Sequence, residues 1–406
     1  MKSLKLGIDA VPYRVIESQW KKLHNIRGFF DKRKPLLLIS RFPTTSEYAV
    51  APSFGLTSTS YQAEKTFSRK TQRTIFYSRL LYTTRRMHGL AYSRSVPDYN
   101  IISYGLTYNF PNTVIDRDIR SIKKEISNNK KRTSIYLSSS DALCHKFGDA
   151  AIKDLLRRVD QEIFPDIDPK CDVTFYSDHG MSIPRKKGLK NIYVEKILEE
   201  NGFRIRSSSL KRKNDILTIR SGLLSFSQLY CHRSADDRMK RRITRLISDE
   251  SAVELAACRL SDRSIIVSNR QGMVRITKEG DRFSCESLEG KPILGKLEGS
   301  YTASELLASS ADHNFPDAVH RLHDAFHGVK DHADILVSLK DGYVSGSALI
   351  NLAYNRLGKY ISTHGSISKD CTSTFAISRD KDATDPYCVE KNRKRYMRIN
   401  DLKLRH

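Results

Sequence analysis

Short apolar runs that end in an acidic or imidazole side chain constrain the fold of this chain most strongly. The run Leu4–Ile8 ends at Asp9, and the run Asp172–Tyr176 is followed by Asp178 and His179. Helical stretches separate such runs along the sequence. Strands that alternate with helices predict a largely parallel sheet covered on both faces. Ligands of such sheets bind beyond the carboxyl ends of the strands, which is where these Asp and His residues fall.

The same alternation continues until a region of different character begins near residue 202. We predict further strands at 35–40, 133–137 and 359–362, a loop at 138–141, and helices at 116–127, 149–163, 190–201, 302–309 and 316–326. Residues 202–299 carry alternating apolar positions with turn residues between them, which favours a smaller β-rich subdomain. The expected fold is α/β, with a central, mostly parallel sheet, helices on both of its faces and an inserted β-rich subdomain.

The insertion is expected to divide the core in two. Residues 1–200 would form its first part, 201–300 the β-rich subdomain, 301–385 the second part of the core, and 386–406 a basic C-terminal segment. Residues 66–108 are rich in Tyr, Arg and Ser, and we expect them to form a lid over a site. A chain of 406 residues suits one large domain with such an insertion.

The composition argues against a membrane protein and for a reducing compartment. Apolar residues make up 39% of the chain, and no apolar run approaches the ~20 residues needed to span a bilayer. Residues 1–9 lack the apolar core of a signal peptide. The seven cysteines include no C-x-x-C pair, and their odd number predicts free thiols rather than a complete disulfide set. We therefore expect the protein in the cytoplasm.

The formal net charge of +24 raises the chance of anionic partners. The basic residues are spread along the chain in modest clusters at 85–86, 186–187, 211–213, 240–242 and 392–395. No nucleic-acid recognition motif accompanies them, so a solvated basic surface is favoured over specific nucleic-acid binding. A positive field would still steer a phosphorylated small molecule toward a cleft.

Three carboxylates and three imidazoles fall at or near predicted strand ends. They are Asp9, Asp141, His145, Asp178, His179 and His364. Together they could fill two metal sites with mixed oxygen and nitrogen ligands, a set that suits Zn²⁺ or, in a more open coordination, Mn²⁺. Taken singly, each has another explanation: Asp141 and His145 could be an i,i+4 helix pair, and Asp178 with His179 could lie in a turn.

A nucleophile candidate lies in residues 42–46 (FPTTS), after a predicted buried strand. Hydroxyl groups at the start of a helix sit where backbone N–H groups and the helix dipole favour a phosphate. Thr44, Thr45 and Ser46 all offer a hydroxyl, and physical reasoning alone does not choose among them. Ser46 taken by itself could equally be a helix N-cap.

Five segments of the chain together resemble the phosphodiesterase/nucleotide pyrophosphatase branch of the alkaline phosphatase superfamily. Residues 176–181 (YSDHGM) resemble its S-D-H-G-M signature, and 136–148 (YLSSSDALCHKFG) resemble its Y-x4-D-x3-H-x2-G segment. Residues 361–378 resemble its H-G-S/T segment with the apolar strand that follows. Gly7–Ala10 stands at its I-D-G or I-D-A element, and 42–46 resembles F-P-S/T-x-T, whose last hydroxyl is the family nucleophile.

The resemblance implies two divalent metal ions and a covalent mechanism. One ion would be held by Asp141, His145 and His364, and the other by Asp9, Asp178, His179 and the oxygen of Ser46. Ser46 would be the nucleophile, with Thr45 as the second choice, and a phosphoseryl intermediate would be hydrolysed by water. Glu47 and Tyr48 stand where animal nucleotide pyrophosphatases often carry an Asn, which weakens any inference about nucleotide specificity.

The resemblance therefore predicts a metal-dependent phosphodiesterase or nucleotide pyrophosphatase. Its substrate would be a phosphorylated small molecule, and a nucleotide is one option. Two alternatives stay open. A phosphomonoesterase, phosphonate hydrolase or transferase of the same superfamily would use the same metal residues. A polyanion-binding protein without catalysis would use the basic surface, and its affinity would depend steeply on salt.

Overall fold

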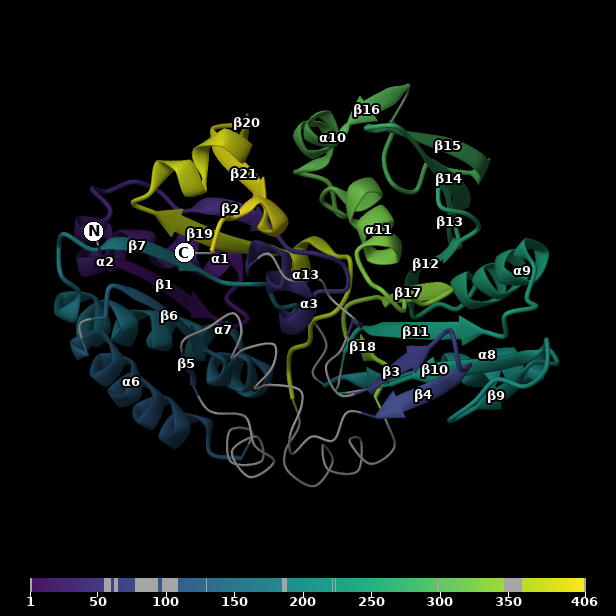
Figure 1. Ribbon diagram of the computed structural model, residues 1–406, viewed down its shortest axis with the longest axis horizontal. Coiled ribbons are helices and arrows are strands. Elements are labelled where there is room, and N and C mark those ends of the chain that lie inside the picture. The colour runs from purple at the N-terminus through teal and green to yellow at the C-terminus, as the bar shows by residue number, and fades with distance from the viewer. Residues whose placement is uncertain are drawn as a thin grey trace.

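The computed structural model describes residues 2–54, 60–61, 65–76, 94–96, 109–128, 130–184, 188–220, 222, 224–297, 299–346 and 360–404. Within these residues two large sheets lie side by side, and helices pack against both (Figure 1). Two short two-stranded pairings accompany them. No helix of this described part is long and apolar enough to cross a membrane.

The first sheet has eight strands from distant parts of the chain. They are β1 (Ser3–Ile8), β2 (Leu36–Ile39), β5 (Arg94–Val96), β6 (Arg132–Leu137), β7 (Asp172–Tyr176), β19 (Ser373–Ser378), β20 (Val389–Lys391) and β21 (Lys394–Arg398). Their order is β20-β21-β2-β19-β7-β1-β6-β5. The centre, from β7 through β1 and β6 to β5, is parallel, whereas β19 runs antiparallel to both β2 and β7.

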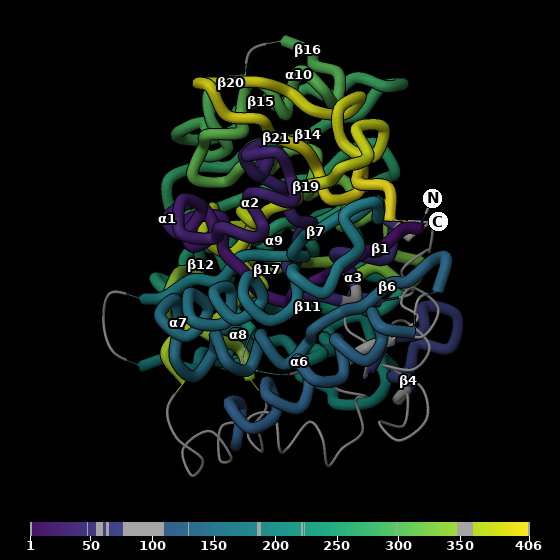
Figure 2. The backbone as a smooth tube through the Cα atoms, turned by 90° about the vertical axis from the view of Figure 1, so that its left-hand side faces the viewer, coloured from purple at the N-terminus to yellow at the C-terminus, as the bar shows by residue number. Residues whose placement is uncertain are grey.

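Helices cover both faces of this sheet, as predicted. Leu6 and Ile8 face one side, where they pack in a single core with α1 (Tyr13–Gln19), α2 (His24–Phe29), α6 (Pro111–Ser127) and α7 (Ser139–Arg158). Figure 2 shows these helices in purple and blue. On the other side, α3 (Ser46–Val50) packs against Leu36 and Leu38 of β2. The alternate residues of β2, Leu37 and Ile39, face the same side as α1 and pack against α10 (Ala303–Ser310). Each fully buried Leu or Ile contributes roughly 1.5–3 kcal/mol to this packing.

Gly7 lies near the end of β1, which runs between β6 and β7 in the sheet. A Cβ there would lie 2.6 Å from the Tyr136 ring and 2.9 Å from the Tyr176 ring. These two tyrosines belong to the neighbouring strands β6 and β7, directly opposite Gly7. The glycine therefore lets two large rings close over the central strand.

The second sheet confirms the predicted β-rich region. Its nine strands are β9 (Arg204–Arg206), β10 (Asp215–Ile219), β11 (Phe226–Cys231), β12 (Val253–Arg259), β13 (Ser264–Asn269), β14 (Gly272–Glu279), β15 (Arg282–Gly290), β16 (Ser300–Thr302) and β17 (Ile335–Leu339). They follow the order β16-β15-β14-β13-β12-β17-β11-β10-β9. One face packs against α8 (Val194–Glu200) and α9 (Asp237–Ser248), and the other against α11 (Ala318–His327).

Three predicted elements are wrong in part. Residues 360–362 form no strand; only Thr363 makes an isolated bridge, to Ser182. The helix predicted at 190–201 begins at Val194, because Lys190–Asn191 forms a strand, β8, with β18 (Tyr343–Val344). Pairing with a distant segment overrides local helix propensity there.

The loop predicted at 138–141 is the start of α7. Ser139 donates to Asp118 Oδ2 at 2.6 Å, and Ser140 donates to the Asp9 carbonyl at 2.8 Å. These buried acceptors hold a serine run, which by local propensity favours a loop, in the first turn of a helix. The helix bends at Gly148 (φ 66°), so its second half begins where the helix at 149–163 was predicted.

The proposed lid at 66–108 lies mostly outside the described residues. Its described parts belong to the hairpin of β3 (Lys65–Ser68) with β4 (Arg73–Phe76) and to the edge strand β5. The basic C-terminal segment contributes β20 and β21 to the first sheet, and Met397, Ile399 and Leu402 are buried beside β2. The domain boundaries given above stay a prediction.

Candidate metal and nucleophile site

The parallel strands β1, β6 and β7 end at one edge of the first sheet. Asp9 follows β1, Asp178 and His179 follow β7, and Asp141 lies in the first turn of the helix after β6. The Ala10 backbone N–H donates to Asp178 Oδ1 at 3.2 Å, so the turn after β1 holds the loop after β7. Ala10 has a φ of 59°, a left-handed conformation that an L residue adopts at a cost of about 1–2 kcal/mol.

Asp9, Asp178 and His179 form one buried cluster. His179 Nε2 lies 3.4 Å from Asp9 Oδ1 and 3.4 Å from Asp178 Oδ2. The ligand atoms of the three residues lie close enough together to hold a single metal ion. Gly180 next to them has no room for a side chain, because a Cβ would lie 2.2 Å from the Asp370 carbonyl oxygen. The chain after His179 therefore packs directly on another backbone.

Of the three adjacent hydroxyls, Ser46 is the one that faces this cluster. Ser46 Oγ lies 3.2 Å from both Asp9 carboxylate oxygens and 3.3 Å from His179 Nε2. Thr45 Oγ1 instead donates to the Tyr61 carbonyl at 2.7 Å. Thr44 Oγ1 accepts the Gly365 N–H at 2.7 Å. The geometry thus separates three hydroxyls that physical reasoning from the sequence left open, and the one that faces the cluster is Ser46, which the resemblance favoured.

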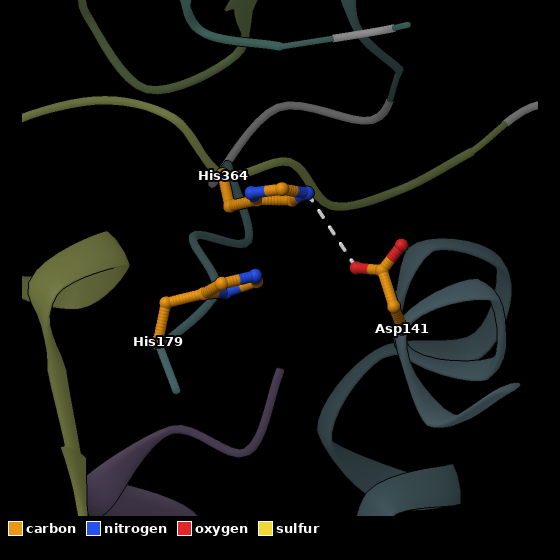
Figure 3. Close-up of side chains that lie close together, drawn as sticks. All are labelled: Asp141, His179 and His364. Carbon is orange, nitrogen blue, oxygen red and sulfur yellow. Dashed lines mark ion pairs between the residues drawn. The ribbon is translucent and has the colours of Figure 1, made fainter. Parts of the chain in front are cut away.

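Asp141, His145 and His364 meet beside the first cluster. Asp141 Oδ1 lies 3.4 Å from His145 Nε2 and 3.5 Å from His364 Nε2. Asp141 and His145 are an i,i+4 pair on α7, which is the explanation without a metal that the sequence left open. The same pair also faces the site. The rings of His179 and His364 stack at 4.2 Å between centroids, so His179 borders both clusters (Figure 3).

Each of the three imidazoles is held through its Nδ1 by a backbone carbonyl. His145 Nδ1 lies 2.7 Å from the Ser362 carbonyl, and His179 Nδ1 lies 2.9 Å from that of Gly180. His364 Nδ1 lies 2.5 Å from the Thr44 carbonyl, in the segment that carries Ser46. A ring that donates from Nδ1 keeps the lone pair of Nε2 for the site, which is the arrangement of metal-ligating histidines.

The surroundings keep His364 neutral. Burial, and then the neighbouring His179, lower the pKa of His364 to about 3. A neutral imidazole is the form that binds a metal ion.

These residues fit divalent metal ions. The carboxylate–imidazole distances of 3.4–3.5 Å are long for direct charge-assisted hydrogen bonds but leave space for a shared cation. Asp178 Oδ2 is buried and accepts no hydrogen bond from any residue that the structure describes. A buried carboxylate oxygen in that state is costly unless a cation or a donor completes its surroundings.

Two buried arginines that the sequence did not single out hold the segment on either side of Ser46. Arg41 is buried; its Nε lies 2.6 Å from Asp324 Oδ2, and its Nη1 donates to the Tyr48 carbonyl at 2.9 Å. Arg321, also buried, donates to the carbonyls of Arg41 and Ile367 at 3.3 and 3.2 Å. Arginine is rarely buried without partners, but nothing local in the sequence marks these two as buried.

Comparison with known proteins supports the fold. No model of a protein family matches the sequence, and no curated protein matches it. Among solved structures, phosphonoacetate hydrolase from Sinorhizobium meliloti 1021 in complex with phosphonoformate aligns over 100% of this chain and 94% of its own, with 11% identity and a TM-score of 0.51. Murine ectonucleotide pyrophosphatase/phosphodiesterase 5 aligns over 99% and 93%, with 11% identity and a TM-score of 0.49.

The phosphonoacetate hydrolase alignment spans nearly the whole of both chains. It includes the first sheet, whose strand ends carry the clustered Asp and His residues. The chain therefore has an alkaline phosphatase-like fold, as its motifs implied.

Proposed function

We propose that this protein is a two-metal phosphoester hydrolase, of the phosphodiesterase/nucleotide pyrophosphatase type, with Ser46 as its nucleophile. The observation that carries the proposal is the position of Ser46 Oγ, within 3.3 Å of both Asp9 carboxylate oxygens and of His179 Nε2. Asp9, Asp178 and His179 would hold one ion, and Asp141, His145 and His364 the other. Zn²⁺ suits this donor set, and Mn²⁺ is the alternative.

The chain's own residues would position the reacting groups. When bound, two divalent ions lower the pKa of a hydroxyl and neutralise charge on the phosphoryl oxygens. Ser46 Oγ attacks phosphorus, the bond to the leaving oxygen breaks, and water then hydrolyses the phosphoseryl ester to free Ser46 and phosphate or a phosphate monoester. Asp9 and His179 orient the Ser46 oxygen throughout, so catalysis rests mainly on positioning and charge neutralisation.

A phosphonate hydrolase is the second candidate, because the aligned Sinorhizobium meliloti enzyme is named for phosphonoacetate and holds phosphonoformate. Phosphomonoesterase and transferase activities would use the same site. A panel of bis(p-nitrophenyl) phosphate, p-nitrophenyl phosphate and phosphonoacetate separates these activities. A preference for the diester supports the first candidate, and turnover of phosphonoacetate alone replaces it with the second.

Replacement of the nucleophile tests the proposal. We expect Ser46→Ala to lower kcat on the diester by at least about a thousandfold while Zn²⁺ still binds, because the metal residues stay in place. Ser46→Thr keeps a hydroxyl and should retain measurable turnover. Thr45→Ala removes a hydroxyl that bonds the Tyr61 carbonyl and should retain far more activity than Ser46→Ala. Full activity in Ser46→Ala would remove Ser46 from the mechanism.

A cytoplasmic location belongs to the same proposal. All seven cysteines are free thiols, five of them buried, which suits a reducing compartment. Cell fractionation tests the location, and recovery of the protein from an oxidising compartment would contradict it.

A further inference from the structure

Two basic clusters that are separate in the sequence meet on one face of the second sheet. The loop at 211–213 precedes β10, and the cluster at 240–242 lies in α9. Lys213 Nζ lies 2.6 Å from Asp236 Oδ2, and Asp236 is the N-cap of α9. At the other side of the helix, the Arg242 guanidinium lies 5.3 Å from the Phe203 ring centroid, next to Arg204. The fold thus joins charges that the sequence spreads out.

Helix α9 turns an arginine stripe to the solvent. Met239, Ile243 and Ile247 are buried against the sheet. Arg238, Arg241, Arg242 and Arg245 follow the i, i+3, i+4, i+7 spacing that places side chains on one helix face. The first three are exposed, and Arg245 is half-buried. At a rise of about 1.5 Å per residue the stripe is roughly 10 Å long.

We call the combined surface the basic face. It consists of Arg204, Lys211, Arg212, Lys213, Arg238, Arg241, Arg242 and Arg245. Much of its charge is not offset locally. The side chains of Arg212, Arg238 and Arg241 form no ion pair with any residue in the described part of the chain.

The acidic residues around the basic face are few and mostly engaged. Asp215 is buried and pairs with Arg204. Asp236 pairs with Lys213, and Asp249 lies 3.7 Å from Arg245 Nε. Asp237 in the first turn of α9 and Glu200 at the end of α8 are exposed. The face therefore keeps an excess of positive charge.

We propose that the basic face binds the phosphate backbone of a nucleic-acid duplex. Guanidinium groups bind phosphate oxygens bidentately, and they dominate this face. A membrane surface fits less well, because interfacial helices insert apolar side chains. The apolar side of α9 is buried, and the exposed large apolar residues Ile75, Phe110, Phe147 and Tyr387 lie on other elements.

A single strand fits less well than a duplex, because single-strand binders stack bases on exposed aromatic rings. Phe203, which lies under Arg242, is only 6% exposed. The binding is electrostatic and independent of sequence. It is also independent of the hydrolase proposal, since α9 and β9 lie at the right of the molecule in Figure 1, whereas the first sheet lies at the left.

Matched charge variants test the proposal. One variant combines Arg212→Gln, Arg238→Gln and Arg241→Gln. Its control combines Lys21→Gln, Lys22→Gln and Lys32→Gln, which are exposed on the first sheet's side and lower the net charge equally. Both are made in a Ser46→Ala background, so that the probes stay intact. Fluorescence anisotropy with labelled DNA and RNA duplexes of 24 base pairs measures affinity between 50 and 300 mM NaCl.

We expect the basic-face variant to bind at least tenfold more weakly at 50 mM NaCl, with a slope of log K against log salt that is less steep by roughly 2–3. The control should change affinity less than threefold. Thermal melting confirms that both variants are folded. Equal loss in the two variants would show a net-charge effect and overturn the proposal, as would the absence of duplex binding at 50 mM. Binding to vesicles with 30% phosphatidylserine is measured in the same variants. If vesicle binding depended on the basic face and duplex binding did not, the face would be assigned to membranes instead.

Discussion

Ser46, Thr45 and Thr44 carry the same functional group within three residues, and the fold gives each a different partner. Ser46 faces Asp9 and His179, whereas the two threonines bond the backbone around Tyr61 and Gly365. The fold also orients the three imidazoles. A backbone carbonyl fixes each Nδ1, so that each Nε2 is left to face the site. At this scale, orientation rather than residue type decides which group can react.

Gly180 offers a prediction at the residue scale. A Cβ at this position would lie 2.2 Å from the Asp370 carbonyl oxygen and 2.6 Å from that of Ser373. We expect Gly180→Ala to destabilise the protein by about 1–3 kcal/mol or more, because both contacts are backbone and cannot turn away. The shift of the loop should also weaken Zn²⁺ binding through His179. Denaturant unfolding and metal titration measure the two effects.

Gly28→Ala is the matched control for that change. Gly28 is exposed within α2, and a Cβ there meets no atom within 4 Å. Alanine in a helix should stabilise the protein by roughly 0.5–1 kcal/mol. If Gly180→Ala were as harmless as this control, the close packing of the loop after His179 would be refuted.

The sequence predicted that Asp9, Asp178 and His179 come together, because they follow short apolar runs whose ends meet in a parallel sheet, and the structure places them in one cluster. The resemblance favoured Ser46 over Thr45, but the physical reason for that order could not be predicted, because it depends on the Tyr61 carbonyl, which only the fold brings near Thr45. The carbonyls that hold the imidazoles could not be predicted either, since every residue carries one.

At the scale of elements, α3, which begins at Ser46, is held against α11, the helix packed on the second sheet. Arg41 contacts both: it pairs with Asp324, and its guanidinium lies 3.5 Å from the Tyr48 ring centroid. Tyr48 OH donates to the Asp324 carbonyl at 3.1 Å. Burial opposes ionisation of Asp324, but the Arg41 charge and hydrogen bond outweigh it and lower the pKa of that carboxyl.

Removal of Arg41 should therefore leave an uncompensated, largely buried carboxylate. We expect Arg41→Met to destabilise the protein by roughly 2–4 kcal/mol. This is less than the cost of breaking a fully buried ion pair, because part of the Asp324 side chain reaches solvent. It should also lower kcat, since α3 carries Ser46. Urea unfolding of Arg41→Met, Asp324→Asn and the double variant measures the coupling. Additive effects of the two single changes would show that the pair does not act as a clamp.

Elements with a strong local signal were predicted well, and those fixed by distant partners were not. The strands of the parallel centre follow from their apolar runs, because both faces of each strand are buried. The pairing of Lys190–Asn191 with β18 and the insertion of β19 between β2 and β7 depend on segments far apart in the chain. The first turn of α7 was missed because its serines are satisfied by Asp118 and the Asp9 carbonyl.

At the scale of the whole molecule, the first sheet carries the candidate site, and a helix packed on the second sheet contacts the segment around Ser46. The ends of β1, β6 and β7 carry the acidic and imidazole groups, while α11, packed on the second sheet, contacts the segment around Ser46 through Arg41 and Arg321. Part of the net charge of +24 gathers on the basic face, where clusters remote in the sequence combine.

Anomalous diffraction from crystals of the full chain grown with Zn²⁺ tests the central claim most directly. The account predicts two peaks about 3.5–4 Å apart. One should lie at ligand distance, about 2.0–2.2 Å, from Asp9, Asp178 and His179 and beside Ser46 Oγ, and the other at that distance from Asp141, His145 and His364. An absence of metal from both clusters in active protein, or ions bound only away from Ser46, would contradict the account.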